Sequence, residues 1–214
     1  MFKDRRDAAN KLATKLLDFY GKDNFIVLGI SSGGMITANE VARQLNVPSD
    51  MLNVCKLRVP DHQTEPMGAI AIGGNTSYNT GIIQHFKVPQ NVIEEVEGKA
   101  RQALKEQVAR YRDNAPLDVS GRSICLVDDG MGTGVTMRAA IDAMKAQGAS
   151  EIIVASPVSS MQVCMMFHGL ADRTICYATP QPFHSVEKWY DDFDKPTDDE
   201  IRALIREGQA QITS

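Results

Sequence analysis

The sequence contains few cysteine, histidine and aromatic residues, and their spacing excludes several kinds of site. Of the 214 residues, 4 are Cys, 4 are His and 1 is Trp. The cysteines form no C-x-x-C pair and the histidines show no metal-ligand spacing, so neither a zinc site nor a thioredoxin-like motif is indicated. Three of the cysteines fall in strand-like apolar runs. We therefore predict buried thiols at Cys55, Cys125, Cys164 and Cys176.

The sequence also lacks long hydrophobic runs and a strong charge of one sign. No run approaches the length of about 20 residues that spans a membrane, and the N-terminus MFKDRRDAANKL is too polar for a secretory signal. The net charge is −4, with scattered Lys and Arg, which argues against a nucleic-acid surface. We expect a cytoplasmic protein that binds small molecules; whether it forms a homo-oligomer stays open.

Linkers and internal repeats are missing too, which favours one domain over residues 1–214. A hydrophobic content of 43% in a chain of this length is enough for one buried core. Apolar periodicity predicts helices at 4–20, 35–45, 89–112, 134–147 and 161–170, and a capping box formed by Thr197 and Glu200 predicts a last helix. Strands are predicted at 25–30, 51–56, 123–127, 152–155 and 174–178, with a mobile loop and a hairpin within 57–86. This alternation predicts a doubly wound, mostly parallel α/β sheet.

One stretch, SICLVDDGMGTGVTM at residues 123–137, carries most of the functional signal. A short apolar strand ends at Asp128 and Asp129, and a loop rich in glycine and threonine leads into a helix. Glycines allow a tight turn with exposed backbone N–H groups, and a helix N-terminus attracts anions. The order strand, carboxylates, loop and helix therefore predicts a site for a phosphate-bearing sugar.

Two other kinds of glycine-rich loop compete with this interpretation. A nucleotide P-loop needs a lysine before its last Ser or Thr, and Val135 stands there instead. A site for S-adenosylmethionine or a dinucleotide needs an acidic residue at the end of the next strand, which here ends on Ser156 and Pro157. The methyltransferase alternative stays open but is disfavoured.

The pattern of four hydrophobic residues followed by D-D-x-x-x-T-G-x-T resembles the loop that binds 5-phosphoribosyl 1-diphosphate (PRPP) in type I phosphoribosyltransferases. Nearly the whole chain is similar to a subgroup of predicted bacterial phosphoribosyltransferases, through DRRDAANKLA, LGISSGGMITANEVA, CKLRVP, MGAIAIGG and TPQPFHSVEKWYDDF. The resemblance implies one antiparallel strand in the sheet and a small C-terminal hood at about 180–214. It also implies that residues 31–34 and 128–136 face each other across one crevice.

The resemblance further implies a role for each part of this crevice. Asp128 and Asp129 would bind the ribose and stabilise the transition state, and Mg²⁺ would be held mainly by PRPP, with no metal site on the protein. The 5-phosphate would be bound by Gly130, Met131, Gly132, Thr133, Gly134, Val135 and Thr136. The diphosphate would be bound by Ser31, Ser32, Gly33, Gly34 and Lys56.

The acceptor side is less specific. Phe183, Trp189 and Tyr190 can stack on a planar base, or they can pack the C-terminal segment onto the body. The segment around 59–67 is expected to close over PRPP and exclude water. Relatives usually carry Pro-Arg where this chain has Ser31 and Ser32, and the loss of a charge-assisted contact corresponds to roughly 1.5 to 3 kcal/mol.

These features lead to one main functional hypothesis and two alternatives. The main hypothesis is a Mg²⁺-dependent transferase that moves phosphoribosyl between PRPP and a nitrogenous base, with diphosphate formed or consumed. The first alternative is a non-catalytic PRPP or nucleotide sensor on the same fold, which the missing arginine keeps open. The second is the methyltransferase.

Overall fold

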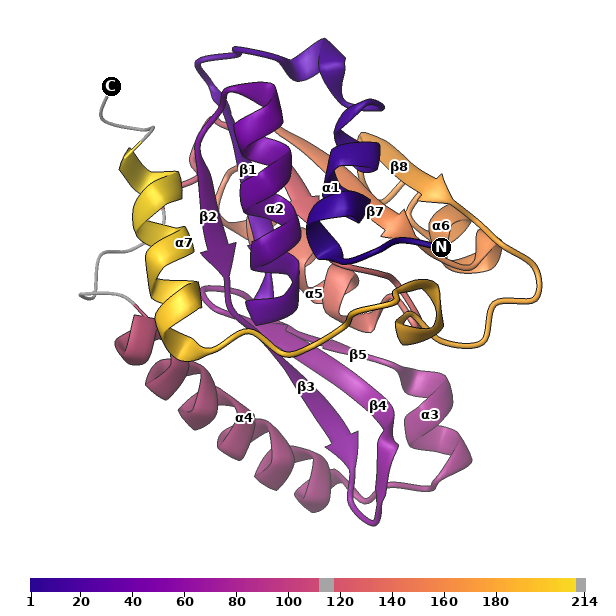
Figure 1. The fold of residues 1–214 in the computed structure, drawn as a ribbon. Coiled ribbons are helices and arrows are strands. Elements are labelled where there is room, and N and C mark those ends of the chain that lie inside the picture. Colours follow the sequence, from indigo (N-terminus) through magenta and orange to yellow (C-terminus); the bar gives the residue numbers. More distant parts are fainter. Residues whose placement is uncertain (112–117, 211–214) are drawn as a thin grey trace.

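The computed structural model describes residues 1–111 and 118–210 (Figure 1). Arg112, where a predicted helix was expected to end, and residues 211–214 of the expected hood lie outside these ranges. The strands are β1 (Phe25–Ile30), β2 (Ser49–Leu52), β3 (Val54–Val59), β4 (His62–Ala71), β5 (Thr76–Tyr78), β6 (Ser123–Val127), β7 (Glu151–Val158) and β8 (Arg173–Ala178). The helices are α1 (Arg5–Ala13), α2 (Ser31–Leu45), α3 (Thr80–His85), α4 (Gln90–Tyr111), α5 (Val135–Ala146), α6 (Met161–Met166) and α7 (Asp198–Ala210). Short 3₁₀ helices lie at Leu17–Phe19 and Glu187–Trp189.

The main sheet has five strands in the order β2-β1-β6-β7-β8, and all four pairings are parallel. From β1 the chain first adds β2 on one side and later β6, β7 and β8 on the other. The winding direction therefore reverses between β1 and β6, which is where open α/β sheets place their ligand crevice. The prediction that the first strand lies beside the strand that ends before Asp128 is confirmed.

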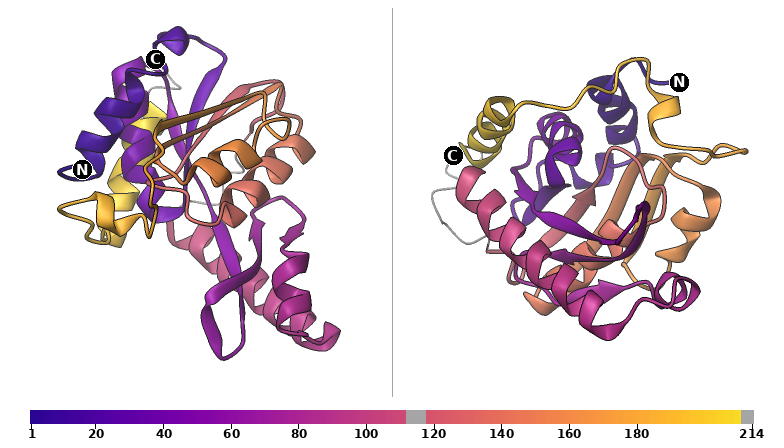
Figure 2. Two further views of the ribbon diagram at one scale, coloured as in Figure 1. Left: turned by 90° about the vertical axis from the view of Figure 1, so that its right-hand side faces the viewer. Right: turned by 90° about the horizontal axis from the view of Figure 1, so that it is seen from below.

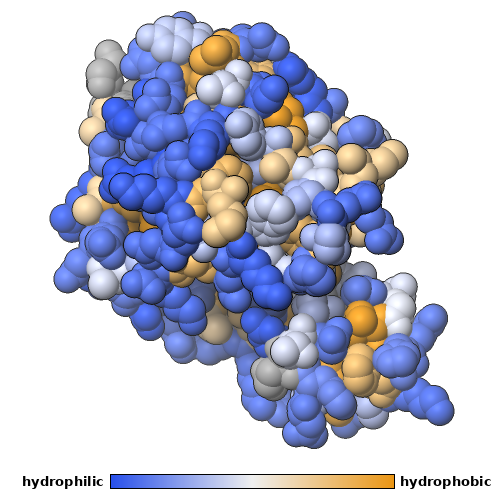
Figure 3. Space-filling view, turned by 45° about the vertical axis from the view of Figure 1, so that its right-hand side comes forward, coloured by the Kyte–Doolittle hydropathy of each residue, from blue (hydrophilic) through white to orange (hydrophobic). Residues whose placement is uncertain are grey.

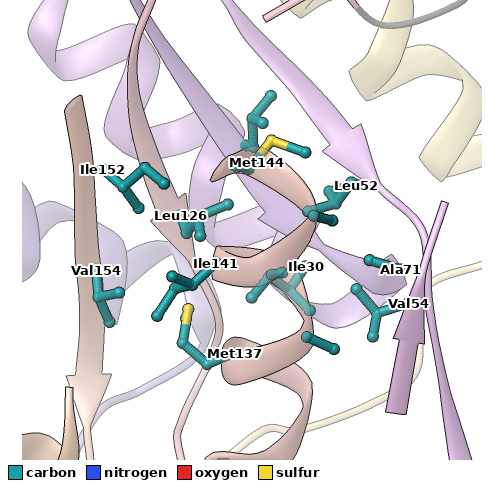
Figure 4. Close-up of a cluster of buried hydrophobic side chains, with 14 of the residues drawn as sticks. Ile30, Leu52, Val54, Ala71, Leu126, Met137, Ile141, Met144, Ile152 and Val154 are labelled. Atoms are coloured by element: carbon teal, nitrogen blue, oxygen red, sulfur yellow. The ribbon is translucent and has the colours of Figure 1, made fainter. Parts of the chain in front are cut away.

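Helices cover both faces of this sheet, as its doubly wound character requires. One face packs under α1 and α2 through Leu12, Val41 and Leu45. The other face packs under α5, where Met137, Ile141 and Met144 point toward Leu126, Ile152 and Val154 (Figure 4). Successive residues of a strand point to opposite faces, so β6 buries Leu126 on the α5 side and Val127 on the α2 side.

A second, antiparallel sheet of β3, β4 and β5 projects from the main body together with α3 and α4 (Figure 2, left). Antiparallel pairing, expected for one strand of the main sheet, is found here instead. The predicted strand 51–56 is in fact two strands, because the chain leaves the main sheet after Leu52 and pairs with β4 from Val54 onward. Asn53 alone separates the two strands, and a single polar residue within a strand-like run is a weak boundary signal.

Other local predictions also differ from the structure: the predicted helix 161–170 ends at Met166, and the predicted strand 152–155 extends over Glu151–Val158. The predicted helix 4–20 ends at Ala13, and a 3₁₀ turn follows. Residues 31–34, left between the predicted strand 25–30 and the predicted helix 35–45, form the first turn of α2, although Ser31 has a left-handed φ of 56°. Cys164 and Cys176 form a disulfide, because α6 and β8 lie side by side; Cys125 is a buried thiol as predicted, and the Cys55 thiol is half-buried.

The C-terminal part crosses the body and ends on α7. The capping box is confirmed, since the Glu200 N–H donates to the Thr197 hydroxyl and the Thr197 N–H donates to the Glu200 carboxylate. α7 then packs on α2 and β2 through Ile201, Leu204 and Ile205. In the described part of the chain, none of the helices combines the length and apolar character that crossing a bilayer demands.

Candidate functional site

The start of α2 and the end of β6 meet at the switch point of the main sheet. A Cβ atom placed on Gly33 would lie 2.5 Å from Oδ2 of Asp129, and one on Gly34 would lie 2.8 Å from the Val127 carbonyl oxygen. Only glycine permits so close an approach of the two segments. The structure thus brings together two of the predicted segments, 31–34 and 128–136, at the carboxyl ends of β1 and β6.

Asp128 and Asp129 are adjacent in the chain but differ in their surroundings. The Asp129 N–H donates to Oδ1 of Asp128 over 2.9 Å. Burial, and then the charge of Asp129, raise the pKa of Asp128 well above its ordinary value, while the nearby Lys56 ammonium opposes this shift. A carboxyl group with a raised pKa can hold or exchange a proton at higher pH than an exposed aspartate.

Asp129 forms an ion pair with Arg5, a residue that the sequence reasoning missed. Arg5 Nε donates to Asp129 Oδ2 over 2.8 Å, and Nη1 donates to the Asp194 carbonyl oxygen over 2.7 Å. The guanidinium lies 3.8 Å from the centre of the Phe193 ring, and the arginine side chain is only 8% exposed. A signal was present, because Arg5 stands on the same helical face as the buried Ala9 and Leu12.

The phosphate loop, residues 130–136, is held at three points by the surrounding structure. A Cβ on Gly130 would overlap Val186, and one on Gly134 would lie 2.9 Å from the Phe167 ring, where Gly134 has a φ of 74°. The Met131 N–H donates to the Val158 carbonyl oxygen over 3.0 Å. Gly132 and Thr133 stay exposed between these anchors. The loop therefore presents its middle to solvent immediately before the N-terminus of α5, with Val135 and Thr136 in the first turn.

A pocket of about 200 Å³ adjoins this loop, between Thr133 to Val135 and the segment of β5 and α3. Arg138 from α5 lines it together with Tyr78 and Met166. In Figure 3 the surface of the molecule has a notch between the main body and the projecting part. A cation and a helix N-terminus thus lie beside the same loop, as an anionic ligand requires.

The residues predicted for the diphosphate are spread over two walls of the crevice. Ser32 and Gly33 line a second pocket, of about 420 Å³, together with Arg5 and Lys195. The Ser31 hydroxyl donates to the Val54 carbonyl oxygen over 3.1 Å and so holds β3 against α2. Lys56, expected at the end of a main-sheet strand, lies within β3 and is exposed.

The hood aromatics occupy different environments. Tyr190 is buried, its ring lies 5.3 Å from Phe2 and 4.8 Å from Phe193, and its hydroxyl donates to the Asp129 carbonyl oxygen. Burial, and then the charge of Asp129, raise the pKa of this tyrosine. Tyr190 thus follows the packing alternative and supports the Asp129 backbone. Phe183 and Trp189 are half-buried against the same cluster.

The site offers few side chains that could bind a metal ion directly. Within residues 1–111 and 118–210, no three His, Cys, Asp or Glu side chains gather into a metal-binding group. The carboxylates at the switch point are those of Asp128 and Asp129, and Asp129 already accepts from Arg5. This donor set fits a magnesium ion that takes most of its oxygen ligands from a substrate and from water.

Comparison with known proteins gives consistent similarities. A family model described as a phosphoribosyl transferase domain matches residues 2–166. Two curated proteins named "Putative phosphoribosyl transferase", from Mycobacterium tuberculosis strains CDC 1551 / Oshkosh and ATCC 25618 / H37Rv, are each 36% identical over 208 residues. The match covers 96% of this chain and 46% of each relative, so the chain spans about half the length of these relatives. The crystal structure of TT1426 from Thermus thermophilus has a TM-score of 0.78 and 31% identity, covering 95% of this chain and 97% of that one.

Proposed function

The chain belongs to the phosphoribosyl transferase family, and from this premise we propose that it is a Mg²⁺-dependent phosphoribosyltransferase. It transfers the phosphoribosyl group between PRPP and a nitrogenous base, so that a nucleotide and diphosphate are formed, or it catalyses the reverse reaction. The observation that carries the proposal is the close contact of Gly33 and Gly34 with Asp128 and Asp129 at the switch point of the sheet. A ligand placed there touches both segments at once.

In this proposal each wall of the crevice binds one part of PRPP. Backbone N–H groups of the phosphate loop and the hydroxyls of Thr133 and Thr136 bind the 5-phosphate, helped by the N-terminus of α5. The start of α2 at Ser32 and Gly33, with Lys56 across from it, binds the diphosphate. The support for this division is that the start of α2 contacts the aspartate pair, while the phosphate loop leads from that pair into α5.

The two aspartates lie where the ribose has to sit. Their carboxylates accept hydrogen bonds from the 2- and 3-hydroxyls and stabilise positive charge on the ribose as the bond from C1 to diphosphate breaks. The acceptor nitrogen forms its bond to C1 and loses its proton. Asp128 and Asp129 are expected to contribute unequally, because only Asp129 is paired with an arginine.

Magnesium, when bound, neutralises charge on the diphosphate leaving group. The residues placed to contact its water shell are Asp128 and Asp129. The acceptor base would lie under the hood near the half-buried Phe183 and Trp189. Tyr190 would act indirectly, because its hydroxyl holds the Asp129 backbone.

A PRPP or nucleotide sensor is the second candidate, and one observation favours it. Ser32 brings no charge to the start of α2, where the family resemblance implies an arginine, and Asp129 is already bound to Arg5. Both features are expected to weaken the binding of PRPP in the arrangement from which transfer occurs. A sensor would bind the same ligands without turnover.

The test combines ligand binding with turnover. PRPP with Mg²⁺ should raise the unfolding temperature, because a ligand that binds only the native state stabilises it. Diphosphate release should appear with one member of a panel of purine and pyrimidine bases. Binding of PRPP without turnover for any base would favour the sensor, and stabilisation by S-adenosylmethionine but not by PRPP would refute the proposal.

Two sets of variants sharpen this test. Asp128→Asn combined with Asp129→Asn should abolish turnover and leave the fold intact, whereas Asp142→Asn, an exposed aspartate on α5, should behave like the wild type. Gly33→Ala should lower turnover by displacing the Asp129 carboxylate. Its control, Gly98→Ala, has open space around the new methyl group in α4 and should raise stability by about 0.5 to 1 kcal/mol without affecting turnover. Wild-type rates in the double aspartate variant would contradict the ribose role.

A further inference from the structure

The pocket of about 420 Å³ between the start of α2 and the segment 193–196 contains a buried arginine for which the family resemblance implies no role. We call this segment the strap. Ser32 and Gly33 form one wall of the pocket, and Phe193, Asp194, Lys195 and Pro196 of the strap form the other, with Glu187 at the rim. Arg5 reaches the pocket from α1 and lies between the two walls.

Arg5 has one guanidinium nitrogen that is not occupied by the protein. Nε is bound to Asp129 and Nη1 to the Asp194 carbonyl oxygen. Nη2 has no hydrogen-bond partner among residues 1–111 and 118–210, and it lies 3.6 Å from the position of a Cβ on Gly33. Although the arginine side chain is only 8% exposed, Nη2 opens into the pocket, where a ligand can accept its hydrogen bonds. The free nitrogen is therefore directed at the start of α2.

The neighbouring groups form an anion site with this nitrogen. The first N–H groups of α2, a helix of 15 residues, have no partner within the helix and carry its positive dipole end. Lys195 adds a cation from the strap. The acidic side chains of Glu187 and Asp194 also line the pocket, but they are exposed at its rim, where water screens them. The remaining donors belong to Arg5, whose side chain is 8% exposed, and to the half-buried first turn of α2.

We propose that Arg5 binds the diphosphate group directly, through Nη2, while Nε of the same guanidinium holds Asp129. This inference rests on the proposed function for the identity of the anion. One arginine on the first helix then connects the two halves of the crevice, because the carboxylate that faces the ribose and the oxygens of the leaving group share it. Lys195 is the second, exposed cation of the same site.

The experiment measures binding of magnesium diphosphate by calorimetry, so it needs no turnover. Arg5→Gln should weaken binding roughly ten- to hundredfold, as expected for a lost hydrogen bond to a charged group. Arg6→Gln is the matched control: Arg6 is the next residue on α1, its side chain is 65% exposed, and it approaches Glu40 at 3.9 Å. It should bind as the wild type does. Lys195→Gln should weaken binding by a few fold.

A second pair of variants separates a direct contact from an effect through Asp129, and also covers the risk that Arg5→Gln unfolds by leaving Asp129 unpaired. Asp129→Asn keeps Arg5, whereas Asp129→Asn with Arg5→Gln removes both charges of the pair. The proposal expects the double variant to bind magnesium diphosphate at least tenfold more weakly than Asp129→Asn alone. Equal affinity of these two variants overturns it, as does an Arg5→Gln variant that loses only ribose 5-phosphate binding.

The outcome is independent of whether the protein transfers phosphoribosyl groups. Diphosphate binding that depends on Arg5, in a protein without turnover, would refute the transferase and leave this site standing. Turnover combined with equal diphosphate affinity in the presence and absence of Arg5 would refute this site and leave the transferase standing.

Discussion

Asp128 and Asp129 show how far the surroundings of two neighbouring identical residues can differ. Asp129 is paired with Arg5 and touches the start of α2, whereas Asp128 is held beneath it, with its pKa raised by burial and by the charge of Asp129. Asp129 is placed to bind, and Asp128 is placed where a negative charge is unfavourable. A bound magnesium complex, or a positive charge that develops on the ribose, would reduce the repulsion between the two carboxylates.

This difference predicts that Asp128→Asn raises stability and lowers activity. The raised pKa means that the native state favours protonated Asp128, so ionisation destabilises the fold as the pH rises above about 4, the range of an ordinary aspartate. Asp128→Asn should therefore raise the unfolding temperature at pH 7, and the gain should shrink toward pH 4. Turnover should fall roughly a hundredfold or more.

Thermal unfolding between pH 4 and 8, with Asp142→Asn as the control, measures the stability effect. Asn can still accept the Asp129 N–H through its amide oxygen, so the loop geometry is retained. An Asp128→Asn protein less stable than the wild type at pH 7 would show that the ionised carboxylate stabilises the fold, against the prediction.

At the scale of elements, the phosphate loop depends on α6. Val163 and Phe167 pack against Gly134. A Cβ atom on Gly134 would lie 3.2 Å from Val163 and 2.9 Å from Phe167. The disulfide between Cys164 and Cys176 attaches this short helix to β8. A helix of six residues has little stability of its own, so the covalent link and the packing on β8 keep it in place.

Loss of this disulfide should therefore affect both stability and ligand binding. Cys164→Ser should lower the free energy of unfolding by about 2 to 3 kcal/mol, as expected for a short closed loop, and should weaken ribose 5-phosphate binding. Dithiothreitol should have the same effect on the wild type. Cys55→Ser, which replaces a half-buried free thiol, is the control. Equal unfolding temperatures with and without reductant would show that the link contributes nothing.

At the scale of the whole molecule, two peripheral parts reach the crevice from different sides. The hood joins the N-terminus, since the Phe2 N–H donates to the Trp189 carbonyl oxygen and the Asp191 N–H donates to that of Phe2. The antiparallel sheet reaches the same crevice with Lys56 on β3. Its ladder is irregular near the turn, with register shifts around Arg58. The end of the β3 and β4 hairpin is therefore the part expected to move.

Ligand binding should slow hydrogen exchange at this hairpin. Amides of residues 58–66 should exchange faster than those of 68–71 in the free protein. PRPP with Mg²⁺ should slow the exchange of 58–66 by on the order of ten- to a hundredfold at saturation, if closure is coupled to binding. β7, which is buried in the main sheet, serves as the internal reference. Unchanged exchange at 58–66 in the ligand-bound protein would argue against closure.

Much of this fold could be predicted from local patterns. The strand at 123–127, the capping box at Thr197 and the main βα alternation are encoded by short-range periodicity and by caps, which do not depend on distant residues. The split of 51–56 into two strands could not be predicted, because only Asn53 separates the halves and it is their pairing partners that differ. The same holds for Cys164 and Cys176, whose pairing depends on the path of the chain between α6 and β8.

The sequence alone determined which residue types make up the phosphate loop and so predicted a phosphate site, since Asp128, Asp129 and the glycines and threonines that follow occur together within a few residues. Only the tertiary structure decided what faces them. Arg5, Ser32 and Asp129 are far apart in the chain and meet because β1 and β6 are neighbours at the point where the winding reverses, with α1 packed beside α2. Contacts of this kind follow from sheet order, and sheet order is a property of the whole packed core.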